Sequence, residues 1–525
     1  MLTSGIGIAV CISSTYCFSI FSNSLKSDYN LGQDDITTIS TIGTACGLFS
    51  MPAGIMFDYV GPQVVLFLAT MIMGMGYLLW MLAFSGVING GLILFCIANS
   101  CGCGVVNTCI LNFPLLRGSV VVLQKTFMGL GSTIIATCFI AFFQSTLQHF
   151  AMFMLIVVLA FGLCGTFVIS LPRYYVTSLS KRKMTQVEIQ NSKQSFDDFC
   201  QIPASTRRLK YGFFLLGVNM VFLTSYNIVA AYSDLSSQAT KACATVAIVL
   251  LVGFVGLPLL PSEHNDARLN EHESGVLLNL DRKVVSIPQF KTSFSQNLRR
   301  PFLWCLVWTT FCNIGTGVVI VSNSAQIYRA INDNEFNVST NALIIALMGV
   351  ASALARVIIG STDMWFERRR REAVEVLSVP LLTTLYPVSS VVAVIGATLL
   401  LVLPASALLL PFVLLSMSYG FIWATTALCT RLMFSKDIGK HYNFGFLSAV
   451  ASTICLNRFL FGELYDQEAH SQGIYPFCSG VACIRTTMLV IIALNSTAVF
   501  TALYVHKTFK KHCSDELEKS STEES

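Results

Sequence analysis

Long apolar segments alternate with short polar ones along most of this chain. Each apolar segment has about twenty residues, which is enough for a helix to cross the roughly 30 Å hydrocarbon core of a bilayer. We predict fourteen such helices, in groups of six, two and six, at residues 4–22, 35–57, 63–84, 90–111, 119–143, 150–171, 211–231, 243–261, 302–322, 341–360, 377–403, 405–430, 443–463 and 481–505. The pattern therefore predicts an all-α polytopic membrane protein.

Two longer polar segments separate the three groups and suggest the domain organisation. We expect an N-terminal six-helix half at 1–171, a cytoplasmic loop at 172–210, two inserted helices at 211–261, a second cytoplasmic loop at 262–300, a C-terminal six-helix half at 301–506 and a cytoplasmic tail at 507–525. The inserted helices are expected to lie beside a twelve-helix core.

Composition and charge support this assignment. The chain is 54% hydrophobic and 12% charged, which excludes an ordinary soluble domain of this size. With the N-terminus inside, twenty-seven of the 33 Lys and Arg residues fall on the cytoplasmic side and four fall outside. Cytoplasmic loops of membrane proteins carry such an excess, so both termini are predicted to be cytoplasmic. Of the 18 cysteines, we expect only Cys478 and Cys483 to form a disulfide.

A polar turn between the second and third apolar segments occurs twice. The first copy contains Gly54, Asp58 and Gly61, followed by Pro62, and it suits a tight connection between two helices. The second copy is expected about three hundred residues later, at Arg356, Gly360 and Asp363. A repeated turn in two six-helix halves is typical of the major facilitator architecture, in which the halves surround a cavity at the membrane midplane. We expect carboxylate–arginine pairs between these two gating turns to close the inner side.

Several motifs resemble the nodulin-like family of the major facilitator superfamily. They are Tyr16-Cys-Phe, the turn at Gly54, the run from Asn112 through Phe-Pro-Leu-Leu-Arg117-Gly, Lys125 with Gly129, and in the second half Asn323, Gln326, Arg356, Gly462 and Tyr465-Asp466. The resemblance covers most of the chain outside the two loops and the tail. It implies solute transport, with small organic anions and metal ions such as iron as the leading substrate classes.

Polar and basic residues within the predicted helices are the candidates for substrate binding. They are Tyr16, Asn99, Asn107, Asn112, Arg117, Lys125, Asn313, Trp423 and Arg458. The alternative for each amide or hydroxyl is a hydrogen bond to a neighbouring helix, which merely packs the bundle. Charges inside a membrane are costly and therefore more informative. Arg458 and Lys125 either attract an anion or extend to the membrane surface, and Arg458 could also pair with Glu463 or Asp466.

Three functions remain open at this point. The preferred one is a secondary transporter of a small, carboxylate-like organic anion, because no Asp, Glu or His lies in the middle of a predicted helix. The second is a metal-ion transporter, with Glu463, Asp466 and His470 as its only candidate ligands. The third is a receptor or scaffold without transport. No nucleophile triad, phosphate-binding loop or nucleotide motif is present, so we predict no enzyme activity, no cofactor and no nucleic-acid partner. The plasma membrane and endosomal or vacuolar membranes are the expected locations.

Overall fold

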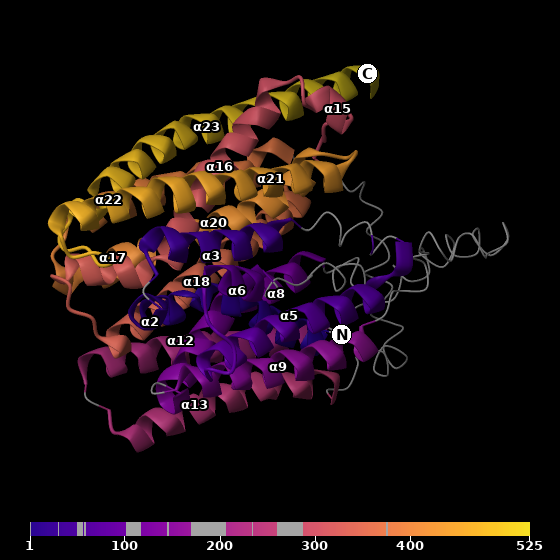
Figure 1. Cartoon of the computed structure of the whole chain (residues 1–525). Helices are drawn as coiled ribbons and strands as arrows, with labels where there is room; N and C mark the ends of the chain where they lie inside the picture. Colours follow the sequence, from indigo (N-terminus) through magenta and orange to yellow (C-terminus); the bar gives the residue numbers. More distant parts are fainter. Residues whose placement is uncertain are drawn as a thin grey trace.

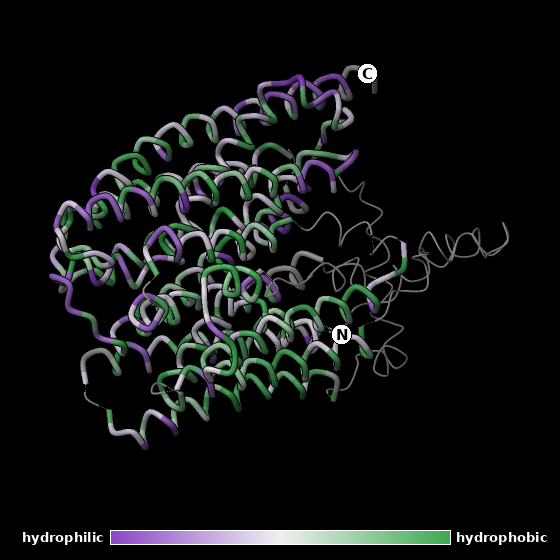
Figure 2. The backbone as a smooth tube through the Cα atoms, in the orientation of Figure 1, coloured by the Kyte–Doolittle hydropathy of each residue, from purple (hydrophilic) through white to green (hydrophobic). Residues whose placement is uncertain are grey.

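The protein is a bundle of long helices in the computed structural model, which describes residues 2–29, 31–49, 56, 59–100, 117–143, 146–169, 206–233, 235–259, 287–373 and 376–524 (Figure 1). The described residues contain no β-sheet, only an isolated bridge between Phe290 and Phe434. Apolar residues line the middle of the helices, whereas hydrophilic residues concentrate toward the ends of the bundle (Figure 2). This distribution is the one expected of helices that cross a bilayer.

The N-terminal half begins with a broken helix and continues with five further segments. Its elements are α1 (Leu2–Ile12), η1 (Ser13–Cys17), α2 (Ser19–Tyr29), α3 (Gln33–Leu48), α5 (Pro62–Phe84), α6 (Leu92–Ser100), α8 (Arg117–Cys138) with the π-helical turn η2 (Phe139–Phe143), and α9 (Leu147–Val168). The two inserted helices are α12 (Thr206–Tyr232) and α13 (Ser237–Val252), the latter extended by η3 (Gly253–Leu259). They lie beside the bundle, with α12 against α8 and α18 (Figure 1).

The C-terminal half contains the longest helices. Its elements are α15 (Phe294–Asn297), α16 (Pro301–Ser322), α17 (Ser324–Ile331), α18 (Val338–Glu372), η5 (Val376–Ser378), η6 (Leu382–Leu385), α19 (Tyr386–Val402), η7 (Ala405–Ala407), α20 (Leu409–Met433), α21 (Ile438–Ser452), η8 (Thr453–Gly462), α22 (Glu463–Gln472) and α23 (Ala482–Glu524). Twelve helices among the described residues are long and apolar enough to span a membrane. Of the fourteen predicted, α3 and α6 are not among these twelve, having 16 and 9 described residues.

The two halves meet along two pairs of helices. Helix α8 packs along α18, and α3 packs against η8. At the first contact, the backbones approach closely because Gly129 and Gly349 have no side chains: a Cβ on Gly349 would lie 2.7 Å from the carbonyl oxygen of Gly129. The hydroxyl of Thr133 also donates to the carbonyl oxygen of Ala346 at 2.7 Å. Small residues allow this packing where lipid provides no hydrophobic drive between helices.

The described part of the first predicted turn has the expected geometry, but the second turn is absent. Gly61 has a φ of 94°, which favours glycine, and Pro62 occupies the first turn of α5. In contrast, α18 continues without interruption from Val338 to Glu372, so Arg356, Gly360 and Asp363 are inside a helix. The prediction of a turn at 356–363 is therefore wrong. No proline follows Gly360 until Pro380, so nothing local ends the helix there.

Candidate functional site

A cavity lies between the two halves, near the middle of the bundle. About 310 Å³ of space there is not filled by atoms, part of it open to solvent. It is lined by Tyr16, Gly129, Ser132, Val321, Ile345, Met348, Gly349, Ser352, Ser416 and Tyr419. These residues come from η1 and α8 of the first half and from α16, α18 and α20 of the second. The rings of Tyr16 and Tyr419 meet edge to face with their centroids 6.0 Å apart. Each half thus supplies one aromatic side chain to the cavity.

Two cations lie one helical turn from this cavity, on the side away from α22. Lys125 precedes Gly129 on α8 by four residues, and Arg356 follows Ser352 on α18 by four residues. Arg356 is only 2% exposed, and its Nη1 donates to the carbonyl oxygen of Lys125 at 2.6 Å. The Lys125 Nζ lies 5.9 Å from the centroid of the Trp423 ring. One positive charge from each half therefore converges at the boundary between them.

The charge of this cluster is not balanced within the described part of the chain. Neither Lys125 nor Arg356 takes part in any of the ion pairs between described residues. Arg356 Nε is buried and has no hydrogen-bond partner there. Burying a charge without a partner is costly, so Arg356, together with the neighbouring Lys125, is a candidate contact for an anionic ligand. Arg356 was predicted to belong to a gating turn; it lies inside α18, one helical turn from the cavity.

Two other predicted residues, Asn99 and Asn313, have different surroundings. Asn99 Nδ2 donates to the carbonyl oxygen of Ile39 at 2.8 Å, and its side chain fills the space beside Gly43, as in ordinary helix packing. Asn313 is buried within the second half, where its Nδ2 donates to Ser390 Oγ at 2.8 Å. Neither residue lines the cavity between the halves, although Asn99 lines a second cavity inside the first half.

Arg458 is the main departure from the predicted site. Its Nη1 lies 2.9 Å from the carboxylate of Glu463, and its Nη2 lies 3.5 Å from that of Asp34 on α3. Of the alternatives that the sequence left open, the structure shows pairing with acidic residues at the α22 end. Its charge is thereby compensated, so Arg458 is not the unpaired cation that an anion site requires.

The remaining predicted residues cannot be placed in this cavity. Gly54, Asp58, Asn107 and Asn112 lie outside the described residues, and of Arg117 only its position at the start of α8 is described. The cations that interact electrostatically with Asp363 are Arg431 and Arg370, both in the second half. Within the described residues, the predicted carboxylate–arginine pair between the halves therefore does not involve Asp363.

The predicted metal ligands do not form a metal site. Asp466 accepts hydrogen bonds from the backbone of α3, Glu463 pairs with Arg458, and the His470 ring stacks on Tyr475. The described residues contain no group of three or more His, Cys, Asp or Glu side chains that could hold a metal ion. In contrast, the predicted disulfide between Cys478 and Cys483 is confirmed.

The two helical halves with a cavity between them have the fold of the major facilitator class of multi-pass membrane proteins. The structure is similar to that of an autoinhibited peptide transporter of the POT family, with 14% identity, coverage of 97% of this chain and 96% of that chain, and a TM-score of 0.53. It is also similar to the xylose transporter XylE from E. coli, with 11% identity, 96% coverage of both chains and a TM-score of 0.52. At these identities, the likeness establishes the fold alone.

Residues 1–259, just under half of the chain, match the family model described as Nodulin-like. The resemblance seen in the sequence motifs is therefore confirmed. Among curated proteins, the chain is 23% identical to Protein NUCLEAR FUSION DEFECTIVE 4 from Arabidopsis thaliana over 92% of this chain and 83% of that protein.

Proposed function

We propose that this protein is a secondary transporter that moves a small organic anion across a membrane by alternating access. The observation that carries the proposal is the pair of cations, Lys125 and Arg356, which approach each other from different halves beside the central cavity. An anion bound between them would contact both halves at once. Its binding would therefore favour whichever arrangement of the halves brings the two cations closest together.

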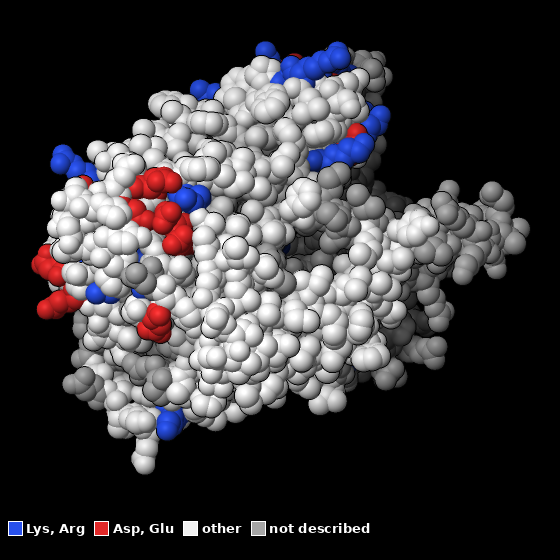
Figure 3. All heavy atoms as spheres, viewed as in Figure 1, with Lys and Arg blue, Asp and Glu red and all other residues white. Residues whose placement is uncertain are grey.

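Contacts between the halves at the α22 end of the bundle support alternating access. At the α22 end, hydrogen bonds connect the halves through Gln33 Nε2 and Asn323 Oδ1 at 2.7 Å and through Asn457 Nδ2 and Ser40 Oγ at 2.9 Å. Figure 3 shows a recess in the surface between the two halves, while acidic side chains gather at the α22 end. The described contacts thus fit a carrier that is closed at the α22 end, with α8 and α18 as the line about which the halves rock.

The other two functions have less support. A dehydrated metal ion needs several oxygen, nitrogen or sulfur ligands, and the residues predicted for that role are engaged elsewhere. A receptor without transport would not need unbalanced cations beside a cavity that both halves line. We therefore retain the anion transporter as the proposed function.

Uptake into vesicles that contain the purified full-length protein tests this function. We expect uptake of at least one radiolabelled mono- or dicarboxylate above that of protein-free vesicles, and competition by other carboxylates but not by neutral sugars. Uptake of Fe²⁺, Zn²⁺ or Mn²⁺ with no carboxylate uptake would contradict the proposal.

The topology remains a prediction, and we propose fourteen spans with both polar segments and both termini in the cytoplasm. The motive is the excess of Lys and Arg in the segments 172–210, 262–300 and 507–525. Epitope tags inserted in these three segments are expected to become accessible to antibody once the plasma membrane is permeabilised, without permeabilisation of a vacuolar or endosomal membrane. A tag in 172–210 that is on the opposite side from one in 262–300 would show that α12 and α13 do not both span the membrane.

A further inference from the structure

A carboxylate of the second half caps a helix of the first half. Asp466 on α22 accepts hydrogen bonds from the backbone N–H groups of Gln33 and Asp34, at 3.0 and 2.8 Å. These groups belong to the first turn of α3, where the helix leaves N–H groups without internal partners and carries a partial positive charge. Asp466 is 8% exposed and thus shielded from water. The cap is normally supplied by the residue before the helix; here it comes from more than four hundred residues away.

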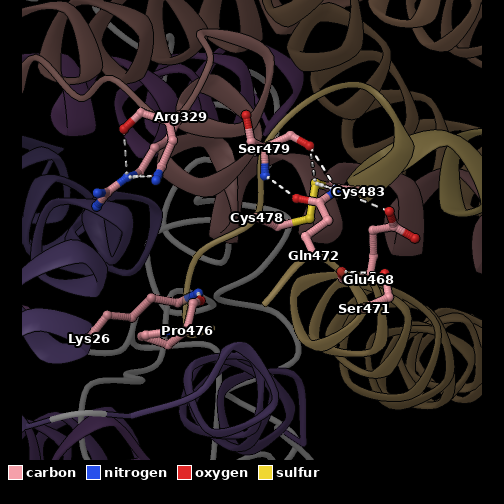
Figure 4. Close-up of a disulfide and its surroundings, with 10 residues drawn as sticks. Lys26, Arg329, Glu468, Ser471, Gln472, Pro476, Cys478, Ser479 and Cys483 are labelled. Carbon is pink, nitrogen blue, oxygen red and sulfur yellow. Dashed lines mark hydrogen bonds between the residues drawn. A yellow bond between two sulfur atoms is a disulfide. The ribbon is translucent and has the colours of Figure 1, made fainter. Parts of the chain in front are cut away.

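A lysine of the first half makes the reciprocal contact. Lys26 on α2 is 1% exposed, and its Nζ donates to the carbonyl oxygen of Pro476 at 2.9 Å. The same Nζ lies 4.8 Å from the ring centroid of Tyr465 and 5.4 Å from that of Phe477. The guanidinium of Arg329 lies 3.4 Å from the Phe477 centroid, so the ring contacts one cation from each half. Figure 4 shows Lys26 pointing toward Pro476 and the disulfide beyond it.

The loop that accepts this hydrogen bond is held in place by several contacts within the second half. Cys478 is joined to Cys483 in the first turn of α23, and Gln472 exchanges two hydrogen bonds with the backbone of Ser479, each 2.9 Å long (Figure 4). The backbone N–H of Gly480 also donates to the carbonyl oxygen of Ala330 at 2.7 Å. The carbonyl group of Pro476 is thus presented by a braced loop.

We propose that Asp466 and Lys26 form a two-part latch that holds the halves closed at the α22 end. The 473–480 loop supplies the carbonyl oxygen of Pro476 that accepts the hydrogen bond from Lys26. Each half contributes one charged side chain that is satisfied mainly by backbone groups of the other half. When the halves separate there, both charges enter water and the N-terminus of α3 loses its cap. The latch does not depend on which solute is carried, so it can be tested separately from the proposal that the solute is an anion.

The burial of Lys26 makes such a latch reversible. Desolvation lowers the pKa of the Lys26 ammonium to about 7, although the Asp466 carboxylate opposes the shift. The closed state therefore bears an electrostatic cost that exposure of Lys26 to water removes. This cost offsets part of the hydrogen-bond energy, so the closed and open states can be close in free energy, as a gate requires.

Acylation of Lys26 measures the opening of the latch directly. The full-length protein is treated with a membrane-impermeant sulfonated N-hydroxysuccinimide ester, and modification of Lys26 is quantified by peptide mass spectrometry relative to the exposed Lys241. We expect little Lys26 modification in the unaltered protein. Asp466→Asn is expected to raise it roughly tenfold, because the change removes a charge-assisted hydrogen-bond acceptor from the closed state.

Two further variants separate opening from altered lysine reactivity. Asn457→Ala removes contacts between the halves without touching Lys26, and it should also raise Lys26 modification. Glu468→Gln neutralises a carboxylate on the same helix that bonds only within its own half, to Gln472, and it should leave the modification unchanged. The proposal is overturned if Lys26 stays protected in both Asp466→Asn and Asn457→Ala, or if Glu468→Gln exposes it equally.

Discussion

Replacing Arg356 with glutamine is expected to lower anion uptake roughly tenfold to a hundredfold, because a hydrogen bond to a charged group contributes about 1.5–3 kcal/mol. Arg356 is buried, and its Nε has no partner among the described residues. The Arg356 guanidinium can therefore form an ion pair with a bound anion without breaking an existing ion pair. The measurement is the initial rate of carboxylate uptake into vesicles at equal protein density. Lys125→Gln should cause a loss of similar size, since it removes the cation of the other half.

Lys440→Gln provides the matched control for this prediction. Lys440 is an exposed cation at the start of α21, and among the described residues it pairs with Asp437, three residues earlier. Its loss changes the net charge by the same amount but leaves the cavity intact, so uptake should not change. If Arg356→Gln and Lys125→Gln transport the anion as well as the unaltered protein does, the site is not where we place it. From the sequence alone, Arg458→Gln would be the decisive variant. In the structure Arg458 is paired with Asp34 and Glu463, so this variant tests the contacts at the α22 end and not anion binding.

Gly349→Ala is expected to destabilise the protein, because the added methyl group lies where α8 and α18 pack closely together. The added Cβ would meet the side chains of Ser132 and Thr133 and lie 2.7 Å from the carbonyl oxygen of Gly129. The backbone carbonyl cannot move aside without shifting α8. Overpacking of this kind costs about 1–3 kcal/mol. The thermal unfolding midpoint in detergent should therefore fall by several degrees, and uptake should fall with it because α8 and α18 form the line about which the halves move.

Gly217→Ala is the control for this change. Gly217 lies within α12, and a Cβ there would have no atom within 4 Å. Alanine is favoured over glycine in a helix by about 1 kcal/mol, so this variant should unfold at the same temperature or slightly higher. Equal losses in Gly349→Ala and Gly217→Ala would show that the close contact between α8 and α18 has no special role.

The positions of the helices could be predicted from the sequence, because each spanning helix coincides with an apolar run that is long enough to cross the bilayer. An apolar run such as that in α5 or α16 crosses the bilayer wherever it lies in the bundle, and the predicted starts at 63 and 302 fall within one residue of those observed. Helix ends were harder to place. The apolar part of α18 ends near Gly360, but its backbone continues through four consecutive arginines, since polar residues end a membrane span without ending a helix.

The candidate site was predicted only in part, for a different reason. Tyr16, Lys125 and Trp423 were identified because polar or charged groups within apolar segments are conspicuous. Arg356 was noticed, but the sequence suggested a turn at its position, whereas the structure places it inside α18. The cap that Asp466 provides to α3 could not be predicted, because the residues around Asp466 do not indicate which distant helix its carboxylate contacts.

What the sequence by itself determined is the class of this protein: a membrane-spanning helical bundle built from two halves, with motifs of the Nodulin-like family. These properties follow from hydrophobic length, charge asymmetry and short motifs, all of which are local. Only the tertiary structure decided which charges are paired and which are not. Arg458 finds two carboxylates at the α22 end, whereas Arg356 and Lys125 meet each other beside the cavity. That difference depends on how the faces of distant helices are turned toward one another, and packing alone sets it.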